Sequence, residues 1–284
     1  MVCYCPERRI LYIHLPKCAG LTIESVLIKK YGFKHFTFPD SDDQYRFLRD
    51  PRGKIGIFKY ILLYSNEARI YDLTSFRKFS IVRNPYNKAE SAIRYLHKNN
   101  ARHNAELEKL KSVTNGSNPM IQQNPMFKEM MKRKMTGIVN NTTFKFPMGI
   151  DFFERYCHVN DYYYMHFSLS QSKCLEDLNG IIDFEIGKFE DLMPELRRIL
   201  FGIYELEEFP IEKVHINKTS RELLNMDINK VREVIKDIHN DDFVNFGYDK
   251  DDLTKSDHIP NQIDELLDFE KTFGENANIE GSMF

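Results

Sequence analysis

The segment from Ile10 to Gly32, ILYIHLPKCAGLTIESVLIKKYG, constrains the fold of this chain more than any other. Residues 10–15 form a mostly apolar run that is typical of a buried strand, and residues 22–30 carry apolar side chains at helical spacing. The turn between them contains Gly20. Because a helix that follows a strand through a glycine-containing turn presents free N–H groups to an anion, this order predicts an α/β fold with an anion site at the turn.

The side chains of this turn indicate which kind of anion it could hold. Lys17 adds a full positive charge, Gly20 allows close approach to the backbone, and Thr22 adds a hydroxyl donor. The lysine precedes the glycine, and a leucine precedes the threonine, so the Gly-Lys-Ser/Thr of a nucleoside triphosphatase is missing. A ligand bound without metal fits these residues better. An ordinary connection with a surface lysine is the alternative.

A second segment, FSIVRNPYNKAESAIRYL, has the same order of elements. A strand over residues 79–82 ends at Arg83, an Asn-Pro pair breaks the chain, and a helix follows that carries Ser91 off its apolar face. A guanidinium and a hydroxyl that converge form a phosphate site. Lys17 and Arg83 both follow a strand and precede a helix, so we expect them at one edge of the sheet. The alternative for this segment is a capped helix with a solvated arginine.

The remaining chain repeats the alternation of strands and helices. Residues 54–64 are predicted as a strand that could run into a helix, IIDFEIGKFEDL as strand, turn and helix, and residues 229–240 as a helix. This alternation predicts a three-layer α/β/α fold with a central parallel sheet. We expect one domain over residues 1–250 and an acidic tail over 251–284 that is partly disordered.

Composition excludes several classes of protein. The formal charge of −2 disfavours sequence-independent binding to nucleic acid, and no apolar run reaches the roughly 20 residues of a membrane span. The first strand begins so early that no room is left for a secretory signal, and five cysteines are few, so a cytoplasmic protein is expected. The spacing of Cys157, His158, His166 and Cys174 fits no usual zinc pattern, so no metal is expected. The sequence does not indicate an oligomeric state.

The two segments together resemble the sulfotransferases that use 3′-phosphoadenosine 5′-phosphosulfate (PAPS), in particular the family 2 type related to carbohydrate sulfotransferases. YIHLPKCAGLTIE is similar to the family's 5′-phosphosulfate loop, and FSIVRNPYNKAESAI to its 3′-phosphate strand and helix. IDFEIGKFEDL, HINKTSR and FGYD resemble later family segments in the same order. The resemblance spans residues 10–249. It implies a P-loop-like three-layer α/β fold, PAPS as co-substrate and no metal.

The resemblance also implies a set of cofactor-binding residues in three groups. These are Lys17, Cys18, Ala19, Gly20, Leu21 and Thr22 around the 5′-phosphosulfate, Arg83 and Ser91 at the 3′-phosphate, and Lys218, Thr219 and Ser220 closing over the nucleotide. Cys18 and Leu21 stand where the family usually has hydroxyl residues. Two side-chain hydroxyls are therefore missing from the pattern, while the backbone donors are retained.

The general base is the least determined part of the resemblance. Some relatives have a histidine about twenty-three residues before the arginine of the second segment, and here that place is Tyr60, a poor base near neutral pH. His166, in YMHFSLSQ, resembles a family segment HWxPQ, and His35 and Glu24 are further candidates. Lys17 is expected to stabilise the charge that develops on the leaving phosphate oxygen.

The resemblance implies transfer of a sulfuryl group from PAPS to a hydroxyl, of a carbohydrate by analogy with the related group. Two alternatives stay open at this point. A catalytically silent relative that binds PAPS, its product or a glycan is favoured by Tyr60, and a P-loop kinase or NTPase is disfavoured by the missing Gly-Lys-Ser/Thr.

Overall fold

The computed structural model of the chain describes residues 2–38, 55–95, 169–208 and 228–252. They contain a five-stranded sheet with the strand order β3-β1-β2-β4-β5. The strands are β1 (Val2–Cys5), β2 (Ile10–Ile13), β3 (Lys34–His35), β4 (Arg77–Val82) and β5 (Glu185–Lys188).

The sheet is mixed, with a parallel part at its centre. β2 pairs parallel with β4 and β4 with β5, whereas β1 lies antiparallel to β2 and β3 antiparallel to β1. The predicted α/β fold is confirmed. The predicted central parallel sheet is also confirmed, in β2, β4 and β5, and residues 2–13 form a hairpin that adds an antiparallel edge to it. The turn of this hairpin closes with a hydrogen bond from Arg9 N to Pro6 O of 3.3 Å.

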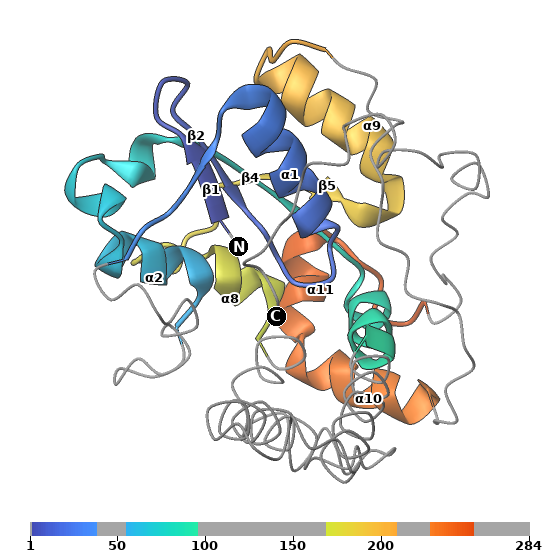
Figure 1. The fold of residues 1–284 in the computed structure, drawn as a ribbon. Helices are drawn as coiled ribbons and strands as arrows, with labels where there is room; N and C mark the ends of the chain where they lie inside the picture. Colours follow the sequence, from blue (N-terminus) through green and yellow to red (C-terminus); the bar gives the residue numbers. More distant parts are fainter. Residues whose placement is uncertain (1, 39–54, 96–168, 209–227, 253–284) are drawn as a thin grey trace, which may run out of the picture.

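Helices lie on both sides of the sheet (Figure 1), with α1 on one side and α2 and α8 on the other. The helix that follows β4 spans 85–95, and α9 continues as a π-helical segment, Arg197–Ile203. The α-helices with printed bounds are α1 (Gly20–Tyr31), α2 (Ile57–Tyr64), α8 (Gln171–Leu175), α9 (Leu192–Leu196), α10 (Ile228–Ile238) and α11 (Asn240–Phe246). Short 3₁₀ turns occupy Glu67–Arg69, Leu73–Ser75 and Phe189–Asp191.

The strand predicted within residues 54–64 is wrong, since this segment forms α2. Its buried side chains are Ile57, Phe58, Tyr60 and Ile61. This spacing places all four on one face of a helix, whereas a strand would turn alternate residues to opposite faces. The apolar run was long enough to suit either structure, and packing against α8 selects the helix.

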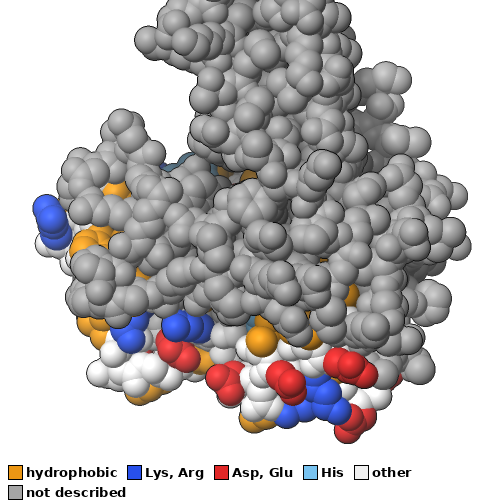
Figure 2. Space-filling model, turned by 90° about the horizontal axis from the view of Figure 1, so that it is seen from below, with side chains coloured by type: hydrophobic (Ala, Val, Ile, Leu, Met, Phe, Trp, Pro, Cys, Tyr) orange, Lys and Arg blue, Asp and Glu red, His pale blue; other side chains and the backbone are white. Residues whose placement is uncertain are grey.

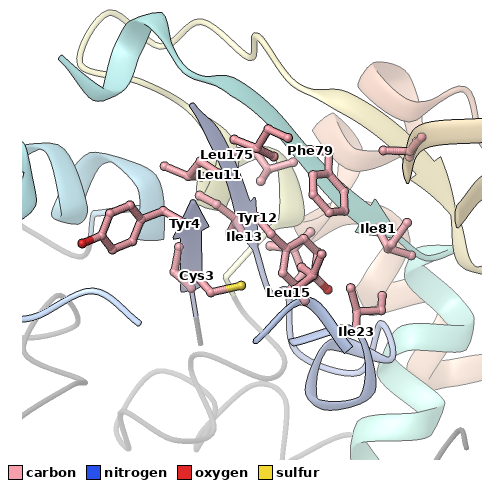
Figure 3. Close-up of a cluster of buried hydrophobic side chains, with 14 of the residues drawn as sticks. Cys3, Tyr4, Leu11, Tyr12, Ile13, Leu15, Ile23, Phe79, Ile81 and Leu175 are labelled. Carbon is pink, nitrogen blue, oxygen red and sulfur yellow. The ribbon is translucent and has the colours of Figure 1, made fainter. Parts of the chain in front are cut away.

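The core lies on both faces of the sheet around β2 (Figure 3). The ring of Tyr12 packs on that of Phe79 in β4, with centroids 4.8 Å apart, and Ile23 of α1 lies on the same side. Leu11 points the opposite way, toward Leu175 of α8. Because successive side chains of a strand point to opposite faces, a strand covered on both sides must be apolar throughout, as the sequence ILYI is.

The surface carries charges of both signs. On the face shown in Figure 2, acidic and basic side chains of described residues lie interspersed, in keeping with the formal charge of −2. Within the described ranges, no helix combines the length and the apolar character needed to cross a membrane.

Candidate functional site

The two loops singled out in the sequence meet at one edge of the sheet. β2 and β4 run parallel with Ile13 opposite Ser80, so both strands end at the same edge. There, Nη1 of Arg83 donates a hydrogen bond of 3.0 Å to the carbonyl oxygen of Lys17. The backbone of the first loop is thus held by a side chain that is 66 residues away in the sequence.

The first loop has an uncommon backbone conformation that leads directly into α1. Lys17 and Ala19 both have left-handed conformations, with φ of 67° and 58°. The Ala19 carbonyl accepts the N–H of Thr22 at 3.1 Å, which begins the helix. The N–H groups of Gly20 and Leu21 precede the point at which a helix can supply acceptors, and they carry the positive end of its dipole. This arrangement can bind an anion.

The side chain of Lys17 contacts an aromatic ring of the second segment. Its Nζ is 3.9 Å from the centre of the Tyr95 ring, on the helix that follows β4. Burial, and secondly the charge of Arg83, lower the pKa of Lys17 to about 8. The positive charges of Lys17 and Arg83 therefore lie close together at the carboxyl edge of the sheet. An anionic ligand bound there would reduce the repulsion between them.

Gln171, at the start of α8, connects the two loops. Its Oε1 accepts the N–H of Arg83 at 2.9 Å, and its Nε2 donates to the Arg83 carbonyl at 2.8 Å. The same Oε1 accepts the Cys18 thiol at 3.4 Å. Gln171 is held in turn by Asp242 of α11, whose carboxylate accepts the N–H groups of Gln171 and Ser172 at 2.8 and 2.7 Å. These buried contacts fix the positions of Arg83 and Cys18 relative to each other.

A second carboxylate supports the residue after Arg83. Oε1 of Glu190 accepts the N–H of Asn84 at 2.8 Å, and its Oε2 accepts the hydroxyl of Tyr248 at 2.9 Å. The guanidinium of Arg83 lies 4.3 Å from the centre of the Phe189 ring. The segments GKFED and FGYD, which the sequence linked to the family only by resemblance, therefore form the support of the Arg83 loop.

A buried histidine and glutamate lie beneath the first loop. Nδ1 of His14 is 3.2 Å from Oε2 of Glu24, and both side chains are less than a tenth exposed. Burial alone would raise the pKa of Glu24, but the hydrogen bond and charge of His14 outweigh it and lower that pKa to about 2. A Cβ on Gly20 would overlap the imidazole ring of His14. No role was predicted for His14 from the sequence, although its position three residues before Lys17 was a usable signal.

The other residues expected at the cofactor differ in their placement. The buried Cys18 thiol points toward Gln171, and burial raises its pKa to about 12. Leu21 is 66% exposed, while Thr22 and Ser91 are partly exposed. Lys218, Thr219 and Ser220 lie outside the described residues.

The base candidates are spread over the molecule. Tyr60 is buried in α2, between the rings of Phe38 and Tyr64 with centroids 5.1 and 4.9 Å away. His35 is exposed on β3, which β1 separates from β2. His166 lies outside the described residues, and Glu24 is bound to His14. A catalytic role for Tyr60, His35 or His166 stays a prediction.

Comparison with known families decides the assignment. A family model described as Sulfotransferase family matches residues 1–249. The chain belongs to the sulfotransferase family. Its membership supports sulfotransfer in general as the activity, and the matched region includes both loops and the supports of Arg83. Searches of curated proteins and of solved structures gave no match.

Proposed function

We propose that this sulfotransferase uses PAPS and transfers its sulfuryl group to a hydroxyl, that of a carbohydrate. The observation that carries the proposal is the bond from Arg83 to the Lys17 carbonyl, which joins the two phosphate-binding segments at the carboxyl edge of parallel strands. A cofactor that has phosphate groups on both its 5′ and 3′ positions needs two such sites side by side.

The two ends of the cofactor are assigned to different loops. The 5′-phosphosulfate is assigned to the N–H groups at the start of α1 and to Lys17, with Thr22 as hydroxyl donor. The 3′-phosphate is assigned to Arg83 and Ser91. Cys18 contributes through the loop backbone and the bond to Gln171, since its side chain faces the interior. Lys218, Thr219 and Ser220 remain assigned to the nucleotide by resemblance.

The reaction follows from this assignment. The acceptor oxygen attacks the sulfur, the bond from sulfur to the bridging phosphate oxygen breaks, adenosine 3′,5′-bisphosphate (PAP) leaves, and the acceptor proton passes to a base. Lys17 stabilises the negative charge on the departing oxygen. His166 is the proposed base on the grounds of its family-like segment.

A binding-only relative is the second candidate, and one observation favours it. Tyr60 occupies the position of the catalytic histidine of some relatives and is buried among aromatic rings, where a phenol does not act as a base near neutral pH. Loss of the base there would leave cofactor binding intact. A cytoplasmic location is proposed for either case.

Transfer of radiolabelled sulfate from PAPS to a panel of glycans tests the proposed activity. Incorporation by the wild type that is lost in Lys17→Met supports it, because methionine keeps the length of the side chain without its charge. PAP binding without transfer to any acceptor supports the binding-only relative. Preference for ATP with Mg²⁺ over PAPS contradicts both.

A further inference from the structure

We propose that His14 is an additional ligand of the 5′-phosphosulfate, held in place for this purpose by Glu24. The inference rests on the proposed function, because it concerns the same anion site. The sequence motifs assign no role to His14 and name Glu24 only as a candidate base, and both side chains are buried.

His14 packs against helix α1. Gly20 and Glu24 are four residues apart in α1, so they lie on the same face, one turn apart. The imidazole of His14 spans this face. Its Nδ1 is 3.2 Å from Glu24, one turn into the helix, and its Cδ2, Cγ and Nε2 atoms occupy the place of a Cβ on Gly20.

The direction of the ring edge follows from the same observation. Cα–Cβ bonds of an α-helix tilt toward its N-terminus, and Gly20 is the first residue of α1. The Cβ position of Gly20 is therefore directed to the end where the helix presents its N–H donors. Cδ2 of His14 lies nearest to that position, with Cγ and Nε2 slightly further from it, so this edge of the ring reaches the helix start while Nδ1 contacts Glu24.

The chemistry suits an anion. The ionised Glu24 accepts from Nδ1, which leaves Nε2 to donate a charge-assisted hydrogen bond whenever the imidazole is protonated. Of the other titratable groups nearby, burial raises the pKa of Cys3 and of Tyr12, so both stay neutral around pH 7, and His35 is exposed on β3. Glu24 therefore supplies the negative charge that offsets His14 before the ligand arrives.

The first loop and the end of β4 add further positive charge to the proposed anion site. Lys17 and Arg83 approach this site from the loop and from the end of β4. A bound dianion is attracted by both cations and by the helix dipole, and we expect it to accept a hydrogen bond from Nε2 of His14 as well.

Two substitutions separate ligand binding from structural support. In His14→Asn the amide nitrogen replaces Nδ1 and keeps the bond to Glu24, whereas in His14→Gln it reaches the position of Nε2 instead. We expect PAPS to bind His14→Asn about ten- to a hundred-fold more weakly than the wild type, as measured by calorimetry near pH 6.5, and His14→Gln to recover part of the loss. Affinity that is higher in His14→Asn than in His14→Gln contradicts the proposal, because it assigns only a supporting role to His14.

Glu24→Gln, which removes the charge but keeps an acceptor, should also weaken binding. Glu7→Gln, an exposed carboxylate in the β1–β2 turn, is its control and should leave affinity unchanged. Equal binding by wild type, both His14 variants and Glu24→Gln overturns this inference alone. A wild type that binds neither PAPS nor PAP overturns the proposed function as well.

Discussion

The imidazole of His14 fills the space that a side chain on Gly20 would need. Gly20 itself is helical, and the left-handed conformations that usually favour glycine occur at Lys17 and Ala19 instead. Glycine is therefore required at position 20 by packing against His14, not by the dihedral angles of the turn.

Gly20→Ala should destabilise the protein because its new methyl group displaces the His14 ring. Overpacking of this kind costs about 1–3 kcal/mol in unfolding free energy, which urea denaturation measures. The same substitution in a His14→Ala background should cost less than about 1 kcal/mol, since the ring is no longer present. Equal costs in the two backgrounds would show that the alanine collides with something else.

Ala19→Gly, in contrast, should stabilise the protein. Ala19 has φ of 58°, a conformation that costs an L-residue about 1 kcal/mol and costs glycine nothing. This gain offsets the greater entropy of glycine in the unfolded chain, so we expect a change between zero and about 1 kcal/mol in favour of folding. Thermal unfolding of the two proteins measures it. A loss above about 1 kcal/mol would mean that the methyl group of Ala19 makes a packing contact of its own.

Gln171→Leu should weaken both folding and cofactor binding. It leaves the N–H and the carbonyl of Arg83 buried without their partner, at a cost of about 1–3 kcal/mol for each unsatisfied group. Denaturation and PAP calorimetry measure the two effects.

Lys173→Ala is the control for this prediction, because Lys173 is exposed two residues further along α8. It should change neither the free energy of unfolding nor the affinity for PAP. If Gln171→Leu destabilised the protein yet bound PAP with full affinity, the link from Gln171 through Arg83 to the cofactor would be wrong.

The affinity for PAP should fall as pH rises above about 8. Burial and the nearby Arg83 lower the pKa of Lys17 to about 8, so its positive charge is present below that pH and is lost above it in the free protein. The phosphates of PAP are fully ionised in this range and contribute no change. Lys17→Arg keeps its charge and should bind with little pH dependence between about pH 7.5 and 9.5. A wild type with an equally flat profile would contradict the placement of Lys17 at the anion.

The local parts of the fold could be predicted from the sequence. The strand, turn and helix over residues 10–31 carry clear periodicity, and α1 begins within two residues of the predicted start. β1 was missed, and its pairing with β2 depends on the hairpin. α2 was misread because a short apolar run without a polar face fits a strand as well as a helix.

The supports of the site could not be predicted in the same way. Gln171 and Arg83 are 88 residues apart, and Asn84 and Glu190 are 106 apart, so no spacing in the sequence relates them. The two loops themselves were found because each carries its cations and its helix start within a few residues. The residues proposed to bind the anion are thus close together in the sequence, while the groups that position them are brought together by the sheet.

Calorimetry of PAP binding without added metal tests the central claim most directly. We predict binding by the wild type and a loss of at least about ten-fold in Arg83→Gln, with Ser91→Ala weakening it less. Because Arg83 is buried, thermal unfolding establishes that Arg83→Gln is folded, and the partly exposed Ser91 provides a second test of the 3′-phosphate site. A wild type that does not bind PAP, or variants that bind it as tightly as the wild type, would contradict the assignment of these two loops to PAPS.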